Sequence, residues 1–181
     1  MKTAIVLVLV AAVAVYGQVH IQKMFEFEDA LPELSGAWQW RSGASNGKTL
    51  RIVDTKGLSE VRMTLCVQPY RGPENVTVSI DNIRYSNDGP VDTIFLKINN
   101  LHFINFTTAE KWRSGLEWNV FKETGPLGPG LNLGAGQYVL SVLPKTDAYG
   151  IELDYIRFNI NNQNPTTNFV CDSQVYFRSL V

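Results

Sequence analysis

The sequence is poor in the residues that most chemical sites require. Its 181 residues include only two cysteines and two histidines, His20 and His102, which are too few for a zinc cluster. An activated nucleophile needs a base beside it, and two histidines give little support to such a pair. No phosphate-binding glycine loop precedes a helix, because no segment has helical periodicity for more than a turn or two. These absences argue against an enzyme.

Charge of either sign is also scarce. Charged residues make up 18% of the chain, and 16 Lys and Arg against 17 Asp and Glu give a net charge of −1. That balance excludes the basic surface expected of a nucleic-acid-binding protein, and it argues equally against a polybasic membrane-surface protein. Apolar residues make up 45%, which suffices for a buried core. The composition indicates a single globular domain.

The longest apolar run lies at the N-terminus. Lys2 is followed by an apolar run over 4–16 that ends at Gly17, a small residue that suits signal-peptidase cleavage. The alternative is a membrane anchor, but the run is well short of the roughly 20 residues that span a bilayer. We therefore expect residues 1–17 to be a cleaved signal peptide. Residues 18–181 are then a single secreted, extracellular domain with no transmembrane segment.

Secretion gives two further sequence features a meaning. Cys66 and Cys171 would meet an oxidising environment, where a lone pair normally forms a disulfide that would tie a C-terminal extension (about 160–181) to the domain. The alternative is two separate thiols. Asn75 and Asn105 each begin an Asn-X-Thr sequon, which predicts a glycoprotein. Asn75 is the favoured site, because Asn105 lies in an apolar stretch.

Alternation with a period of two dominates the rest of the chain. Val61, Met63 and Leu65 alternate with polar residues, and the stretch 75–85 changes phase near Asp81 and Asn82, which predicts a bulge. Glycine, proline and asparagine turns separate such runs. Strands are predicted at 21–28, 38–41, 49–53, 60–68, 75–85, 93–99, 116–122, 137–143, 151–160 and 170–177. Many short strands without helices favour two packed antiparallel sheets.

Two glutamates near the start of the mature chain form a candidate site. Glu26 and Glu28 alternate with Phe25 and Phe27, so both carboxylates are predicted to project from one face of one strand. Neighbouring carboxylates on one face repel each other unless a cation or a basic group neutralises them. From the spacing alone, a cation site and two solvated surface charges are equally compatible with the pattern.

Several segments carry a recognisable pattern when they are taken in order. They are the Glu-X-Glu stretch 25–30, the Ser/Gly-rich loop 42–48, the stretch 83–89 with Asn99-Asn100, and the pair 133–138 and 150–156. From about Phe25 to Asn159 this order resembles carbohydrate-binding modules of families 6 and 35. The resemblance implies an all-β fold, an antiparallel jelly-roll β-sandwich like that of galactose-binding domains. It also implies a secreted, lectin-like, non-catalytic protein that binds a glycan or polysaccharide.

The resemblance also implies a structural calcium ion. These modules hold the ion with the glutamates of the first strand and the aspartate of the last, which by position are Glu26, Glu28 and Asp154 here. Carboxylate and carbonyl oxygens are the ligands that Ca²⁺ prefers. Calcium is therefore the expected cofactor.

The sugar contacts that the resemblance implies are less regular in this chain. Such modules stack the apolar C–H face of a pyranose on loop aromatics. Trp112 and Trp118 lie in the corresponding segment, and Asn46 and Tyr85 are the further expected contacts. The family often has a stacking tyrosine where this chain has 49–52, which contains no aromatic residue. The alternative function is a structural or adhesive extracellular-matrix protein that keeps the sandwich without binding sugar.

Overall fold

Antiparallel strands account for nearly all of the chain that the structure describes. The computed structural model describes residues 19–30, 38–53, 59–67, 76–109, 118–162 and 175–179. Every strand pairing in these ranges is antiparallel, and the one helical element in them is a short 3₁₀ turn. None of these ranges holds a helix long and apolar enough to cross a membrane. The expected all-β sandwich is confirmed.

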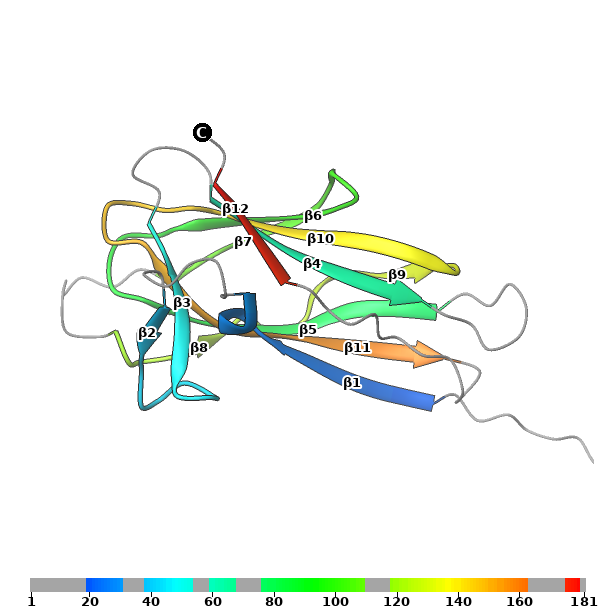
Figure 1. Ribbon diagram of the computed structural model, residues 1–181, viewed down its shortest axis with the longest axis horizontal. Coiled ribbons are helices and arrows are strands. Elements are labelled where there is room, and N and C mark those ends of the chain that lie inside the picture. The colour runs from blue at the N-terminus through cyan, green and yellow to red at the C-terminus, as the bar shows by residue number, and fades with distance from the viewer. Residues whose placement is uncertain are drawn as a thin grey trace, which may run out of the picture.

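Two sheets lie face to face, one above the other in Figure 1. The seven-stranded sheet contains β1 (Val19–Glu26), β2 (Trp38–Trp40), β3 (Lys48–Ile52), β5 (Val76–Asn87), β8 (Lys122–Glu123), β9 (Leu127–Leu133) and β11 (Ile151–Asn162). The five-stranded sheet contains β4 (Ser59–Val67), β6 (Thr93–Ile98), β7 (Leu101–Thr107), β10 (Gly136–Lys145) and β12 (Val175–Ser179). The 3₁₀ turn η1 (Phe27–Ala30) follows β1 and contacts β3, β11 and β12.

The core lies between the sheets and follows the alternation of the sequence. Val61 and Met63 on β4 are fully buried. Leu153 and Phe158 on β11, in the other sheet, belong to the same buried cluster. Burying an aliphatic or aromatic side chain of this size stabilises a fold by about 1.5–3 kcal/mol each. From Val61 to Leu65 on β4 and from Ile156 to Ile160 on β11, every second side chain is buried. Each of these stretches therefore has one apolar face, and the sheets pack face to face.

Two strands are absent from the sequence prediction, and a third begins later than expected. β7 follows Asn99 and Asn100, whose φ angles of 48° and 66° form a two-residue hairpin turn of the kind that reverses directly into the next strand. β9 contains Gly128, Pro129 and Gly130, residue types that are typical of turns. Among the described strands it pairs with β5 alone, and an edge position tolerates proline. The strand predicted at 116–122 is wrong over Trp118 and Asn119, which form a turn.

The predicted bulge is present. Asn82 pairs with Arg157 and Ile80 pairs with Phe158, so Asp81 is the extra residue between two paired positions. Arg157 Nε donates to Asp81 Oδ2 at 2.5 Å, and the Asn159 amide donates to Asp81 Oδ1 at 2.9 Å. The phase change in the sequence therefore marked a real interruption of the ladder.

Several expectations fall on parts of the chain that the structure leaves undescribed. The signal peptide, Asn75, Cys171 and the side chain of Cys66 lie outside the described residues. β12 pairs with β4 so that Val175 is opposite Met63, which brings the chain following Cys171 to the strand that carries Cys66. The disulfide stays a prediction. Asn105 is exposed on β7, so burial does not prevent its glycosylation, which also stays a prediction.

A buried aspartate connects three chain segments at one end of the sandwich. Asp92 is 1% exposed, its N–H donates to Thr108 Oγ1 at 2.8 Å, and its Oδ1 accepts from the Asp147 N–H at 3.0 Å. Its Oδ2 has no hydrogen-bond donor among the described residues. Burial raises the pKa of Asp92 to about 7, and the nearby negative charge of Asp147 adds to the rise.

We expect the ionisation of Asp92 to lower stability as the pH rises. The pKa of this side chain is 3.8 in the unfolded chain and about 7 in the fold, so its contribution is fully favourable below pH 3.8 and is lost by pH 7. Asp92→Asn removes this penalty, and its advantage over the wild type should grow by about 2 kcal/mol between pH 5 and pH 8. Urea unfolding of both proteins at pH 5 and pH 8 measures this difference in the free energy of unfolding. A difference that does not change with pH would contradict the prediction.

Candidate cation site

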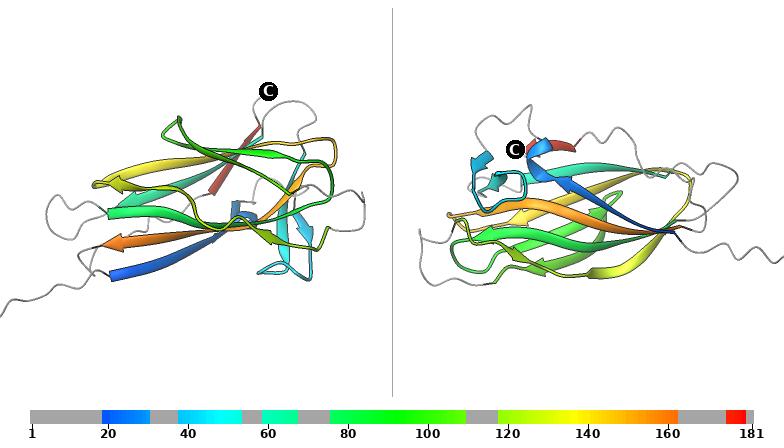
Figure 2. Two further views of the ribbon diagram at one scale, coloured as in Figure 1. Left: turned by 180° about the vertical axis from the view of Figure 1, so that it is seen from behind. Right: turned by 90° about the horizontal axis from the view of Figure 1, so that it is seen from below.

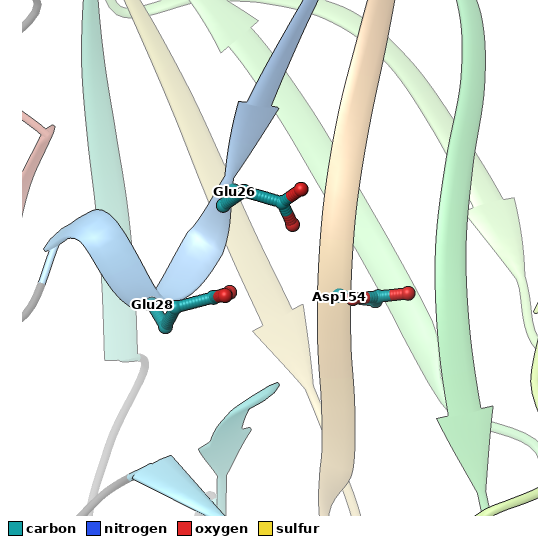
Figure 3. A group of neighbouring side chains, drawn as sticks. All are labelled: Glu26, Glu28 and Asp154. Atoms are coloured by element: carbon teal, nitrogen blue, oxygen red, sulfur yellow. The ribbon is translucent and has the colours of Figure 1, made fainter. Parts of the chain in front are cut away.

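Three carboxylates from two distant parts of the chain, residues 26–28 and residue 154, meet at one point of the seven-stranded sheet. Glu26 ends β1, Glu28 lies in η1 and Asp154 lies on β11. One oxygen from each lies within 4.8 Å of the others. Figure 3 shows Glu26 and Glu28 directing their carboxylates toward the strand that carries Asp154. The three residues predicted as metal ligands therefore lie together.

The two glutamates reach this point from different elements, not from one strand. β1 ends at Glu26, which pairs with Tyr155, and the strand predicted through Glu28 is wrong in its last two residues. Phe27 is fully buried in the core, and the chain turns into η1 around it. This turn leaves the Glu28 side chain 8% exposed and close to Glu26. Burial of the phenylalanine thus brings the second carboxylate to the site.

A second bulge places the aspartate. Leu153 pairs with Tyr85 and Tyr155 pairs with Arg84, so Asp154 is the extra residue on β11. A bulge changes the direction in which its side chain projects, and bulges are common beside functional sites. Asp154 is fully buried, yet its carboxylate reaches Glu26, Glu28 and the loop between β2 and β3.

The carboxylate of Glu28 is buried without a partner of its own. Neither of its oxygens accepts a well-formed hydrogen bond from the described residues. Burial raises the pKa of Glu28 to about 7, the charge of Glu26 adds to this, and the neighbouring Asn46 side chain offsets only part of it. An unpartnered buried carboxylate is costly. A cation or a bound proton would remove this cost.

Glu26 and Asp154 share one hydroxyl group. The Ser45 hydroxyl oxygen lies 2.7 Å from Glu26 Oε2 and also 2.7 Å from Asp154 Oδ1. A serine hydroxyl has one proton, so it donates to only one of these carboxylates at a time. The Ser45 N–H adds bonds of 3.1 and 3.2 Å to the two oxygens of Asp154. Burial raises the pKa of Glu26, and the charge of Asp154 contributes to the rise.

One basic side chain neutralises part of the cluster. Arg84 donates to Asp154 Oδ2 at 2.5 Å and to the Gly43 carbonyl at 2.9 Å. When Glu26, Glu28 and Asp154 are ionised, the three carboxylates and this one guanidinium leave two negative charges uncompensated. A divalent cation would balance them. The donor set contains only oxygen, which fits Ca²⁺ better than a transition metal.

A short loop covers the cluster and is itself anchored by a buried ion pair. The loop between β2 and β3, residues 41–47, is closed by a bond from the Arg41 N–H to the Gly47 carbonyl at 3.0 Å. Arg41 also donates to Glu152 Oε2 at 2.7 Å and to Oε1 at 2.5 Å, and Glu152 is fully buried. The ion pair fixes one end of the loop, and Ser45 connects its middle to the carboxylates.

The predicted sugar contacts lie in different environments. Trp118 is half-buried, and the Arg51 guanidinium lies 4.5 Å from the centre of its ring. Asn46 is exposed on the loop beside Glu28. Tyr85 is 5% exposed, packs against Phe106 and accepts a bond from the Ala109 N–H, so as a surface contact it is wrong. Trp112 lies outside the described residues.

An exposed aromatic pair beside the loop was not among the predicted contacts. Trp40 is 66% exposed, and its ring meets that of Trp38 edge to face at a centroid distance of 5.4 Å. Lys48 lies over both rings. The Trp-X-Trp spacing was the available signal, because residues two apart on a strand share a face. Whether the two rings are buried or exposed depends on the position of the strand in the sheet, and the Trp-X-Trp spacing does not predict that position.

Comparison with known proteins yields no family. No family model and no curated protein matches the chain. Solved structures with a loose likeness include an exo-β-1,3-galactanase from Phanerochaete chrysosporium (20% identity, TM-score 0.49, 75% of this chain and 28% of that one). Another is a cycloisomaltooligosaccharide glucanotransferase from Paenibacillus sp. (16%, 0.48, 75% and 18%), and a third is PorU from Porphyromonas gingivalis (12%, 0.44, 80% and 13%).

The chain thus spans less than a third of the length of each of these proteins. The first two are carbohydrate-active enzymes by name. The fold therefore rests on the strand pairing of this chain, and the site rests on its own carboxylates.

Proposed function

We propose that this chain is a secreted, non-catalytic carbohydrate-binding protein with a structural calcium site at Glu26, Glu28 and Asp154. The observation that carries the proposal is the convergence of these carboxylates, with neither oxygen of the buried Glu28 carboxylate accepting a well-formed hydrogen bond from the described residues. This is the arrangement that the resemblance to families 6 and 35 implied. When bound, Ca²⁺ would supply charge neutralisation and hold the ligand-bearing loop in place; it would have no part in a reaction.

The arrangement of the loop supports a binding role. Ser45 joins the carboxylates to the loop 41–47, and the Arg84 guanidinium joins Asp154 to the Gly43 carbonyl of the same loop. Gly43 N–H in turn donates to Asn119 Oδ1 at 2.8 Å, which connects the loop to the turn that carries Trp118. A cation held at this point therefore fixes two loops at one end of the sandwich. Preorganised loops bind ligands with a smaller loss of conformational entropy.

The non-catalytic part of the proposal rests on the partners of the acidic residues. A glycosidase needs two carboxylates facing one another across an open site. The Arg41 guanidinium holds Glu152, the Tyr155 hydroxyl donates to Glu123 at 2.9 Å, and the Arg157 guanidinium holds Asp81. The carboxylates of Glu26, Glu28 and Asp154 face one another at distances that suit one ion rather than a sugar ring.

A glycan array tests the proposal. The full-length chain, secreted from eukaryotic cells and supplied with Ca²⁺, should bind a restricted set of glycans saturably, and free sugar should compete. The bound oligosaccharides should be recovered at unchanged length, because no reaction occurs. Binding to no glycan, accompanied by self-association, would overturn the proposal in favour of an adhesive matrix protein. Shortened oligosaccharides would overturn its non-catalytic part.

A further inference from the structure

An exposed aromatic cluster lies at the end of the sandwich that carries the cation site. It consists of Trp38 and Trp40 on β2 and Lys48 at the start of β3, and we call it the Trp–Lys cluster. Trp40 pairs with Lys48, directly across the base of the loop 41–47. β2 is the outermost strand of its sheet, and Figure 2 shows β2 and β3, in cyan, at one end of the molecule.

The two indole rings are held in a fixed arrangement. Their centroids are 5.4 Å apart and their planes are inclined at 80°. The Lys48 ammonium lies 4.7 Å from the centre of the Trp40 ring and 5.2 Å from that of Trp38. A lysine placed over aromatic faces in this way is attracted to them. The lysine and the tryptophans therefore form one unit with a defined position for the positive charge.

Trp40 opens the cluster to solvent, while Trp38 and Lys48 are half-buried, and no carboxylate of the described residues forms an ion pair with Lys48. Trp40 is 66% exposed, which is unusual for the largest apolar side chain. No acidic side chain in the described part of the chain lies within 4 Å of the Lys48 ammonium. An apolar ring beside an uncompensated cation is complementary to a ligand with an apolar face and a negative charge.

We propose that the Trp–Lys cluster binds an anionic glycan, with the pyranose ring packed against the solvent-exposed part of the Trp40 indole and its carboxylate or sulfate group paired with Lys48. The C–H face of the sugar covers the exposed indole, and the anion approaches the ammonium. This inference rests on the proposed function and adds to it the location of the site and the chemical class of the ligand. The sugar contacts expected from the sequence were Trp112, Trp118, Asn46 and Tyr85, none of which belongs to this cluster.

The geometry favours a glycan over a protein that extends the sheet. β2 has only three residues, Trp38–Trp40, so its outer edge offers few backbone groups to an added strand. The rings stand perpendicular to each other and form an angled surface with a cation, which suits a sugar ring better than a flat apolar partner. Self-association through this edge is therefore an outcome that contradicts the proposal.

The experiment measures binding of the full-length secreted chain to three polymers. The probes are polygalacturonate, which carries carboxylates, λ-carrageenan, which carries sulfates, and neutral dextran. The wild type should bind one or both anionic polymers at least tenfold more tightly than dextran, and raising the salt concentration should weaken that binding. The stronger anionic polymer identifies the acidic group that Lys48 prefers.

Variants separate the cluster from a merely structural role. Trp40→Ala should weaken anionic binding about tenfold, and Trp40→Tyr should restore most of it. Lys48→Gln should remove the preference for anionic over neutral polymer, while Lys48→Arg keeps it. Tyr149→Ala is the matched control, because Tyr149 is an exposed aromatic (47%) whose hydrogen bonds with the described residues involve only its backbone. Melting temperatures establish that each variant is folded.

The outcomes distinguish this inference from the function on which it rests. If the wild type binds glycans on the array but Trp40→Ala and Lys48→Gln bind as tightly as it does, the Trp–Lys cluster is not the site and glycan binding stands. A preference for dextran overturns the ligand class. Concentration-dependent dimerisation that Trp40→Ala abolishes shows that the cluster is a protein interface. If the array shows no binding at all, the proposed carbohydrate-binding function is overturned, and the inference about the Trp–Lys cluster is overturned with it.

Discussion

Replacing Glu152 by alanine is expected to lower the free energy of unfolding by about 3–5 kcal/mol, because it leaves the Arg41 guanidinium half-buried without its partner. Glu152 is fully buried and accepts two bonds from Arg41 and one, at 3.1 Å, from Thr49 Oγ1. Chemical unfolding of the variant measures the loss. The loss should be accompanied by weaker calcium binding, since Arg41 anchors the loop that contains Ser45.

A second ion pair provides the matched control for Glu152. Asp81 and Arg157 are also 2.5 Å apart, but the Arg157 side chain is 32% exposed and that of Asp81 is 18% exposed. A partly solvent-exposed pair contributes less than a buried one, about 0–1 kcal/mol at the surface, so Asp81→Ala should cost less than Glu152→Ala. If Glu152→Ala and Asp81→Ala lowered the free energy of unfolding equally, the burial of Glu152 would not be the reason for its contribution to stability. The double variant Arg41→Met with Glu152→Leu should recover most of the stability.

Calcium is expected to reverse the effect of Glu28→Gln on stability. In chelator at pH 8, above the pKa of about 7, Gln should be as stable as Glu or more so, because the buried carboxylate accepts no well-formed hydrogen bond from the described residues. In saturating Ca²⁺ the wild type should be the more stable protein. At one hundred times the dissociation constant the ion adds about 2.7 kcal/mol, which corresponds to a shift of about 5–10 °C in Tm.

The neighbouring aspartate serves as the control for this reversal. Asp29 is exposed beside Glu28, so Asp29→Asn should retain the calcium-dependent rise in Tm. Asp154→Ala should lose that rise, but it also leaves Arg84 without its partner and should be less stable in chelator as well. Glu28→Gln therefore separates metal binding from the network of Asp154. The same Tm for the wild type in Ca²⁺ and in chelator would contradict the prediction.

The three candidate ligands could be named from sequence because their pattern is local. Glu26 and Glu28 belong to one short stretch, and Asp154 is placed by the segment order of a known family. The contacts that hold these carboxylates together could not be predicted from a local pattern. Ser45 and Arg84 reach Asp154 only because a bulge at that residue shifts the register of β11 against β5. Strand register depends on the whole sheet, and no short stretch of sequence contains it.

Alternation predicted the strands that have one apolar and one polar face. β4 and the later half of β11 were recognisable because every second side chain is buried from Val61 to Leu65 and from Ile156 to Ile160. β9 was not, because Gly128, Pro129 and Gly130 are typical of turns, and it becomes a strand only by pairing at the edge of the sheet. The exposure of Trp40, like the strand conformation of β9, depends on a position at the edge of the sheet. Tryptophan on a strand is usually buried, and it is the outermost position of β2 that leaves this one in solvent.

The occupancy of the carboxylate cluster is tested most directly by titrating Ca²⁺ into the metal-free, full-length secreted chain in a calorimeter. Binding of one ion per chain is predicted, with Glu28→Gln abolishing or greatly weakening it and Asp29→Asn leaving it unchanged. Mg²⁺ should bind much more weakly, because an irregular oxygen site does not meet its octahedral requirement. Absence of calcium binding by the folded wild type would contradict the assignment of Glu26, Glu28 and Asp154 as a cation site.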